Sequence, residues 1–444
     1  MSKQKHIAIK ASKKSISSMI LSILMLLSVI PLHSSTIYAD GSRKAIMFRT
    51  GDIKGYDKTT KKYDSIYFGF GNVNIGSHKG EPIQWRVLDT KTNTGEEEGP
   101  FLLSETLMGS TSFGDIEFND FGKKNEWQGS KAQNWCKNFS GEEETLHIKS
   151  LDNRELGAIL PTNKDDKQYT AVSEDIKFLS SDKILDGDKV FFISAEETEK
   201  YFPTKEERKA TYKLSDNYGI MWWLRSPYED GATAGTVRKE GEFYHSTLNF
   251  GQTGRPAFNL DKEKVLFTSP AVGGKQSNAV GKDALKVVVD TDTTEWKLTL
   301  IDDSRKLTVD NKGVKKEGST LTIPIQFENN ETLYKDSEYI SAIIVETAGK
   351  NEIITHYGKV LNLEEGTKIG SKTLTVQLPD GLFDTQTQTQ TQTHKLYLIN
   401  EQLNGDKKTD YSSEKVEVKI PAQQPLVFED KAEYDIPEGK QGET

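Results

Sequence analysis

Adjacent aromatic rings in one short segment are the first residues whose chemistry suggests binding. Trp222 and Trp223 stand side by side in the segment IMWWLRSP, residues 220–227. In an extended strand the two rings would face opposite sides, and an exposed tryptophan offers a flat platform to a sugar ring or an apolar side chain. Large aromatic side chains lie mostly in cores, so burial of both rings is the favoured interpretation.

Arginines in this segment and in GQTGRPAFNL, residues 251–260, offer a second kind of chemistry. A guanidinium group can bind a carboxylate or backbone carbonyls with paired hydrogen bonds, or it can hold an anionic ligand. For Arg225 and Arg255 we favour the structural use over ligand binding. The candidates for ligand binding are Trp223, Arg225, Tyr228, Tyr244 and Arg255.

No set of residues in the sequence has the spacing of a catalytic or metal centre. The single cysteine, Cys136, falls on the apolar face of an expected helix, which favours a buried hydrophobe over a nucleophile. The histidines are scattered without zinc-ligand spacing. Asp182, Asp186 and Asp188 lie close enough in sequence to offer oxygens to calcium, but they do not match an EF-hand loop. The sequence therefore predicts no catalytic residues, no cofactor and no metal site.

Two helices are expected around these residues. After the candidate N-cap Ser130, apolar side chains recur at helical spacing up to Phe139. Ser194 and Glu197 have the spacing of a capping box, which predicts a helix from Ala195 to about Phe202. Strand patterns surround both helices, so we expect an α+β domain over residues 44–265 with helices set against a twisted antiparallel sheet. The expected strands cover residues 66–70, 83–88, 101–103, 189–194, 236–238 and 242–248.

A second domain is expected at residues 284–421. A small and polar stretch, residues 266–283, predicts the linker before it. Period-two alternation, as in residues 296–301, puts one face of each strand in a core. Several such strands without a helical pattern predict an all-β, immunoglobulin-like sandwich. Pro324 lies inside one of these strands and predicts an edge position for it.

The N-terminus has the pattern of a secretory signal. Residues 1–18 contain five lysines and no acid, and an apolar run follows from Met19 to Leu32. That run is shorter than the roughly 20 residues that a membrane span needs. We expect a signal peptide at residues 1–39 with cleavage after Ala39, so that the mature protein has no membrane span and is secreted or held at the cell surface. An uncleaved anchor is the alternative.

Composition agrees with export and limits the partners. One cysteine in 444 residues excludes an internal disulfide. Acidic residues outnumber lysine and arginine, 67 to 58, and loss of the signal removes further lysines. A net negative charge argues against nucleic acid as a partner. The last residues, 422–444, are acidic with little apolar content, and we expect them to form a tail. The oligomeric state does not follow from the sequence.

Six ordered sequence blocks resemble a domain of unknown function that is common in exported proteins of Firmicutes. Over residues 65–262, the Trp-Trp-Leu-Arg-Ser-Pro block is the most distinctive of them. Tyr228 departs from the pattern, because a glycine often follows Ser-Pro there. The closing blocks are also similar to C-type-lectin-like folds, which implies a lectin-like first domain. The blocks are Ile83–Leu88, Ser130–Phe139, Val190–Ser194, Glu197–Phe202, Trp222–Pro227 and Gly254–Ala257.

Three functions fit these observations. The first is a binding or adhesion protein that recognises a glycan or a surface protein through the lectin-like domain, and an exposed aromatic cluster around Trp223, Tyr228 and Tyr244 would support it. The second is a structural surface protein without a ligand of its own. The third is an enzyme that acts on extracellular polymers, which requires a cleft with paired carboxylates. We expect a non-enzymatic binding protein.

Overall fold

The computed structural model describes most of the chain between Arg43 and Pro421. The predicted signal peptide and the predicted acidic tail lie outside the described residues. The chain divides into two units, Met1–Arg43 and Lys44–Thr444, and the sites described below lie in the second unit. The described residues are 43–72, 79–95, 98–109, 115–172, 175–212, 221–275, 279–329, 337–348, 351–364, 366–383 and 392–421.

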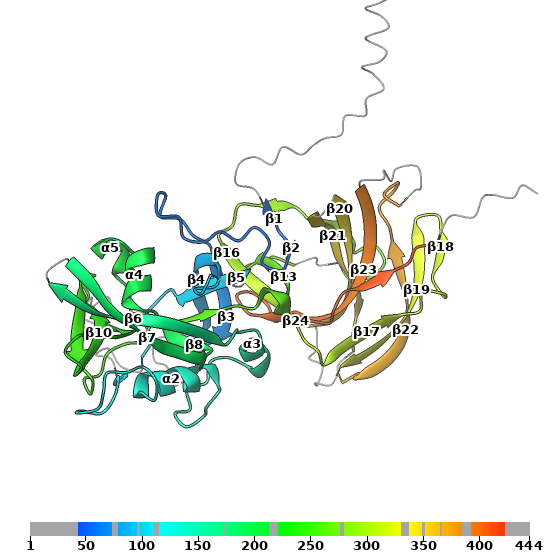
Figure 1. Cartoon of the computed structure of the whole chain (residues 1–444). Coiled ribbons are helices and arrows are strands. Elements are labelled where there is room, and N and C mark those ends of the chain that lie inside the picture. The colour runs from blue at the N-terminus through cyan, green and yellow to red at the C-terminus, as the bar shows by residue number, and fades with distance from the viewer. Residues whose placement is uncertain are drawn as a thin grey trace, which may run out of the picture. The chain divides into compact units, whose positions relative to one another are not determined.

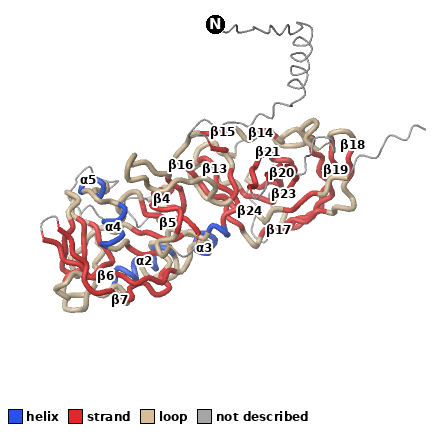
Figure 2. The backbone as a smooth tube through the Cα atoms, turned by 45° about the horizontal axis from the view of Figure 1, so that its top comes forward, coloured by secondary structure: helices blue, strands red, loops and turns tan. Residues whose placement is uncertain are grey.

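The expectation of an α+β, C-type-lectin-like first domain is wrong. The structure is mostly β, with 50% strand and 9% helix, and its strands form several sheets. Figure 2 shows how short the helical segments are beside the strands. The helical patterns in the sequence do correspond to helices, but each helix has only a few turns. Thr162–Val172 and Asp175–Asp188 form a long hairpin that the expected strands do not include, and the first of these segments shows no apolar alternation.

Both predicted helices are present, and their N-caps are confirmed. Helix α2 (Lys131–Ser140) starts after Ser130, whose side chain accepts a hydrogen bond from the Gln133 N–H. Helix α4 (Ala195–Tyr201) has the complete capping box, with Ser194 and Glu197 each bonding the other's backbone N–H. Among the described residues, the other helical elements are α3 (Asn153–Gly157), α5 (Lys205–Arg208) and the 3-10 turn η2 (Lys262–Lys264).

Most strands before residue 271 belong to three groups. A central group follows the order β3-β4-β5-β12-β8, a separate sheet has the order β11-β10-β9, and β6 pairs with β7 as a long hairpin (Figure 1). The bounds are β1 (Arg43–Lys44), β2 (Met47–Phe48), β3 (Ser65–Phe70), β4 (Pro82–Lys91), β5 (Glu98–Ser104), β6 (Thr162–Val172), β7 (Asp175–Asp188), β8 (Val190–Phe192), β9 (Trp222–Pro227), β10 (Thr233–Val237), β11 (Phe243–Thr247), β12 (Pro256–Asn259) and β13 (Val265–Pro270).

The part after residue 284 is built from strands, as the sequence predicts. Apolar residues of β19 and β22 from one sheet and of β20 and β23 from another share one core, an arrangement that fits an all-β sandwich. The bounds are β14 (Lys286–Val287), β15 (Asp290–Thr291), β16 (Glu295–Ile301), β17 (Arg305–Val309), β18 (Lys315–Glu317), β19 (Thr320–Asn329), β20 (Glu338–Ala348), β21 (Asn351–Asn362), β22 (Ile369–Gln377), β23 (Gln392–Gln402), β24 (Asp410–Ser412) and β25 (Val416–Val418).

One sheet runs through both parts of the chain. Strand β16 pairs in parallel with β3 through its first residues and with β24 through its last, and β13 pairs with it from the other side. Trp296 and Leu298 of β16 belong to the same core as the first-part strands. The stretch expected to be a linker therefore begins inside β13, and it also holds the buried Lys275.

The edge position expected for Pro324 is wrong. Its strand β19 has β22 on one side and both β17 and β18 on the other. Pro324 lies where the neighbour changes from β17 to β18, and its carbonyl accepts a hydrogen bond from the Asp310 N–H in the connecting turn. The missing proline N–H faces the same turn, so a central strand tolerates it.

Candidate functional site

Arg225 holds a fully buried charge cluster together. Its side chain lies in β9 with no solvent exposure, 2.7 Å from a Glu197 oxygen and 3.1 Å from an Asp166 oxygen. It also donates to the carbonyl of Phe192 at the end of β8. Glu197 belongs to the capping box of α4 and binds Lys164 from β6. This residue therefore joins four elements, which is the structural use favoured from the sequence.

The pKa values of the two acids differ because their cationic partners differ. Burial raises the pKa of Asp166 to about 6, although Arg225 opposes the effect. Burial also raises the pKa of Glu197, but Arg225 and Lys164 together lower it well below the usual value. Glu197 therefore remains ionised, and Asp166 gains a proton more readily.

Arg255 is buried without a carboxylate bonded to it. Its Nε donates to the Ser104 carbonyl at 3.0 Å, and its guanidinium lies over the rings of Phe202 and Trp222, 5.4 Å from each centroid. Burial lowers its pKa to about 9, and the nearby charge of Arg86 lowers it too. The ring contacts and the Ser104 bond give Arg255 a packing role in the core.

Both tryptophans of the Trp-Trp pair are buried, as the sequence analysis favoured. Trp222 is 1% exposed and Trp223 is not exposed at all. The Nε1 of Trp223 donates to the Ile116 carbonyl, and its ring packs against Phe118. Trp223 is thus a core residue, and its ring has no face open to a ligand.

The structure brings Tyr228 and Tyr244 together on either side of His245. The Tyr228 and His245 rings stack with centroids 4.1 Å apart, and the Tyr244 and His245 rings with centroids 4.8 Å apart. Arg238 lies over Tyr244 at 3.4 Å. Tyr244 is half-buried and Tyr228 is 9% exposed. The stack uses the ring faces for its own contacts, so it presents mainly ring edges to solvent.

The other sequence candidates for chemistry also have structural surroundings. Cys136 is buried, and burial raises the pKa of its thiol well above the usual value. Asp188 accepts hydrogen bonds from Trp127, Gln128 and Gln133. Within the described residues, no group of three or more histidine, cysteine, aspartate or glutamate side chains is placed to hold a metal ion.

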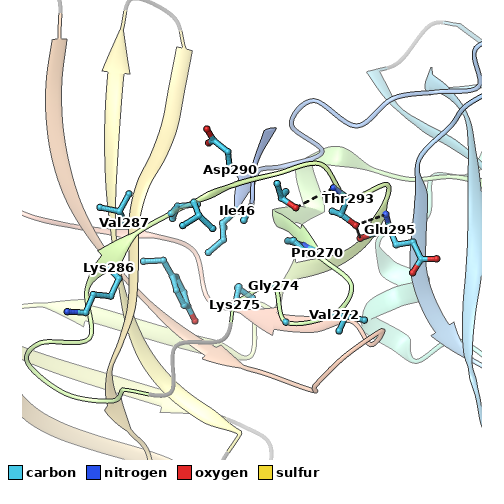
Figure 3. Close-up of a pocket in the computed structure, with 16 residues that line it drawn as sticks. Ile46, Pro270, Val272, Gly274, Lys275, Lys286, Val287, Asp290, Thr293 and Glu295 are labelled. Atoms are coloured by element: carbon cyan, nitrogen blue, oxygen red, sulfur yellow. Dashed lines mark hydrogen bonds between the residues drawn. The ribbon is translucent and has the colours of Figure 1, made fainter. Parts of the chain in front are cut away.

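A cavity of about 450 Å³ lies beside the start of the second part. Figure 3 shows the segment 286–295 along one side of it and the loop 270–275 along the other. Its rim carries unusually exposed apolar side chains, because Val272, Val287 and Val289 are 58%, 65% and 67% exposed. The lining also includes the charged residues Lys286, Asp290 and Glu295. A concave site of this size is what small ligands and peptide side chains occupy in proteins.

One wall of the cavity is a strand edge. The Val288 N–H donates to the Thr355 carbonyl of β21, and the Ala45 N–H donates to the Val289 carbonyl from the opposite side. Successive residues of a strand direct their backbone groups to alternate sides, so those of Val287 face away from β21. After Ala45 the chain leaves this edge, since Met47 pairs with Thr268 of β13. Within the described sheets, β14 has β21 as its one strand neighbour.

Sequence reasoning missed this cavity. The rim valines lie in KVVVD, residues 286–290, which has the pattern of an ordinary start to a core strand. One sequence signal was available. Residues 287–289 are all valine, whereas a strand with one buried face should alternate apolar and polar residues. The other wall, 270–275, falls in the stretch expected to be a linker.

Part of the chain matches a known family. Residues 98–262 match a domain of unknown function, DUF6273. This confirms the coarse part of the resemblance noted in the sequence, a domain of unknown function over this region. No curated protein matches the chain. The DUF6273 segment contains Arg225, Arg255 and the aromatic stack, whereas the cavity is formed by residues on both sides of the segment.

The described helices give no sign of a membrane span. None of those in the described ranges is both long and apolar enough to cross a bilayer. Helix α2, with 10 residues, carries the interior face of Trp135, Cys136 and Phe139 beside polar residues. Its apolar face is thus used inside the DUF6273 segment.

Proposed function

We propose that this chain is an exported or cell-surface binding protein, and that its cavity receives an extended segment of a protein partner. The observation that carries the proposal is the strand edge at Val287, which borders a cavity of about 450 Å³ with exposed valines around it. Export rests on the basic and apolar pattern of residues 1–39. A protein partner is preferred to a glycan because the Trp223 ring is buried.

The backbone and the side chains of the cavity supply different parts of recognition. An extended peptide can add to a free strand edge through its own N–H and C=O groups, which gives affinity without reading sequence. The apolar side chains Val272, Val287 and Val289 then favour partner residues that are β-branched or otherwise apolar. Alternate residues of the partner would face the cavity, so specificity is expected at every second position.

Val287→Asp is expected to weaken peptide binding by roughly tenfold or more, because it places a charge against apolar partner side chains. The probe is a displayed library of random short peptides selected on the wild-type protein, with affinities of the enriched peptides measured by fluorescence polarisation. Enriched peptides should lose binding when backbone N–H groups on one edge are methylated.

The matched control is Ile369→Asp, which changes another exposed apolar side chain, 74% exposed, that does not line the cavity. It should leave the affinity unchanged. If selection enriches no peptide, or if the enriched peptides bind the Val287→Asp protein as tightly as the wild type, the cavity is not a peptide site. Binding to a glycan array in place of peptides would contradict the choice of a protein partner.

A further inference from the structure

Two lysines and two acids meet in the interior where β13, β16, β23 and β24 come together. Lys297 Nζ lies 2.8 Å and 2.9 Å from the two carboxylate oxygens of Asp410. Lys275 Nζ lies 3.0 Å from Asp410 Oδ2 and 3.0 Å from Glu401 Oε2. The side chains of Asp410 and Glu401 are not exposed, and those of Lys275 and Lys297 are only 2% and 6% exposed.

The two lysines have different surroundings. Lys275 donates hydrogen bonds to Thr299 Oγ1 at 2.7 Å and to Glu401 Oε2 at 3.0 Å, and Asp410 Oδ2 lies 3.0 Å away as an ion-pair partner. Glu401 is held in place by a hydrogen bond from the Tyr357 hydroxyl. Lys297 shares Asp410 with Lys275 and has the Gly405 carbonyl as its other acceptor. Lys275 and Glu401 therefore form a balanced pair of their own.

The pKa values of the lysines follow these contacts. Burial lowers the pKa of Lys275, but Asp410 and Glu401 raise it by more. For Lys297, burial lowers the pKa and the charge of Lys275 lowers it again, so that Asp410 does not restore the usual value. Lys297 is thus the amine that gives up its proton more easily, and a neutral amine is a nucleophile.

We propose that Lys297 and Asp410 condense to an intramolecular isopeptide bond between the adjacent strands β16 and β24. Asp410 is paired with Thr299, and Lys297 lies two residues before Thr299 on the same face of β16. The amine and the carboxyl group therefore touch without movement of the backbone. Holding reactants in contact in this way removes much of the entropic barrier to their reaction.

The reaction balances without any other reagent. The Lys297 ammonium passes a proton to Asp410 Oδ1, which leaves a neutral amine beside a carboxylic acid. The Nζ lone pair attacks Cγ of Asp410, and the charge that develops on Oδ2 is stabilised by the Lys275 ammonium 3.0 Å away. A proton from Nζ then moves to Oδ1, the Cγ–Oδ1 bond breaks and water leaves. The products are one amide and one water molecule.

The surroundings favour the product. Two buried charges are costly to keep out of water, and condensation removes those of Lys297 and Asp410 while leaving the Lys275–Glu401 pair balanced. Lys275 and Tyr357 also line the cavity of Figure 3, which offers the water a path to solvent.

Mass spectrometry of the intact wild-type chain tests the proposal. The measured mass should be lower by one water than the mass calculated for the purified chain from its own N-terminus, and this calculated value is the sequence mass used below. A tryptic digest should contain one branched peptide that joins the segments around Lys297 and Asp410, with no cleavage after Lys297. An intact mass equal to the sequence mass would overturn the proposal and leave the four residues as an ion network. A branch at any other lysine would overturn it as well.

Lys297→Arg keeps the positive charge but cannot form the amide, and it should show the full sequence mass. The matched control is Lys164→Arg, which changes another lysine paired with a buried acid, Glu197 at 2.8 Å, and should keep the loss of one water. Water loss that persists in the Lys297→Arg chain would count against the proposal. These masses do not depend on peptide binding, so failure here is distinct from failure of the proposed function.

Discussion

Replacing Arg225 by methionine is expected to lower the free energy of unfolding by roughly 3–5 kcal/mol. The substitution removes the cation from a cluster in which Glu197 and Asp166 have almost no solvent exposure. Glu197 then keeps its ion pair with Lys164, whereas Asp166 loses the guanidinium that lies 3.1 Å from it. Urea unfolding followed by tryptophan fluorescence measures the change, because the rings of Trp222 and Trp223 lie in the adjoining core.

The cost should come from the unpaired acids, which a second variant can show. In the chain with Arg225→Met, Asp166→Asn and Glu197→Gln together, no buried carboxylate is left without Arg225, and we expect much of the lost stability to return. Lys124→Met is the control for an exposed ion pair, since the Lys124 and Glu126 side chains are 82% and 61% exposed. It should change stability by less than about 1 kcal/mol. A similar cost for Arg225→Met and Lys124→Met would show that the buried cluster contributes little.

Stability is expected to fall as the pH rises from about 5 to 8, and Glu155→Gln should remove a large part of that fall. Glu155 accepts hydrogen bonds from the N–H groups of Gly69 and Asp152 and from the Thr409 hydroxyl. Burial, together with the charge of Asp152, raises its pKa from 4.5 to about 7. Unfolding at a series of pH values measures the effect in both proteins.

The sign follows from which state binds the proton. In the folded protein Glu155 keeps its proton up to a pH of about 7, whereas the unfolded chain loses it near pH 4.5. The proton on Glu155 therefore contributes its full stabilisation of the folded state below pH 4.5. That contribution is lost as the pH rises through about 7, and it amounts to about 3 kcal/mol at most. Glutamine does not titrate, and Asp166 is common to both proteins and cancels. Parallel stability curves for the two proteins would contradict the raised pKa of Glu155.

Local signals in the sequence predicted local structure correctly. The caps at Ser130 and Ser194 act through backbone groups three residues away, so they are visible in a short window. Burial of Trp222 and Trp223 followed from the cost of leaving large rings in water. Several strands of the second part, β16 and β19 among them, were recognised because one face of each enters a core.

The features that the sequence did not predict depend on residues that are distant from one another in the sequence. The hairpin of β6 and β7 was missed, because its first strand, TNKDDKQYTAV, shows no apolar alternation and is held by its neighbour. Pro324 predicted an edge, since the turn that accommodates it comes from another strand. The Lys297–Asp410 contact joins residues more than a hundred positions apart, and no spacing rule reveals it.

Strand β16 limits which segment of this chain could be transferred to another protein and still fold. The DUF6273 segment begins at residue 98, inside the sheet, and its strand β5 is paired with β4, which lies outside the segment. Beyond β4 come β3 and then β16, whose Trp296 packs in the same core. A graft of residues 98–262 would carry a cut sheet edge and a core that lacks the residues of β3, β4 and β16. In this chain, a segment that folds on its own must therefore include residues before 98 and after 262.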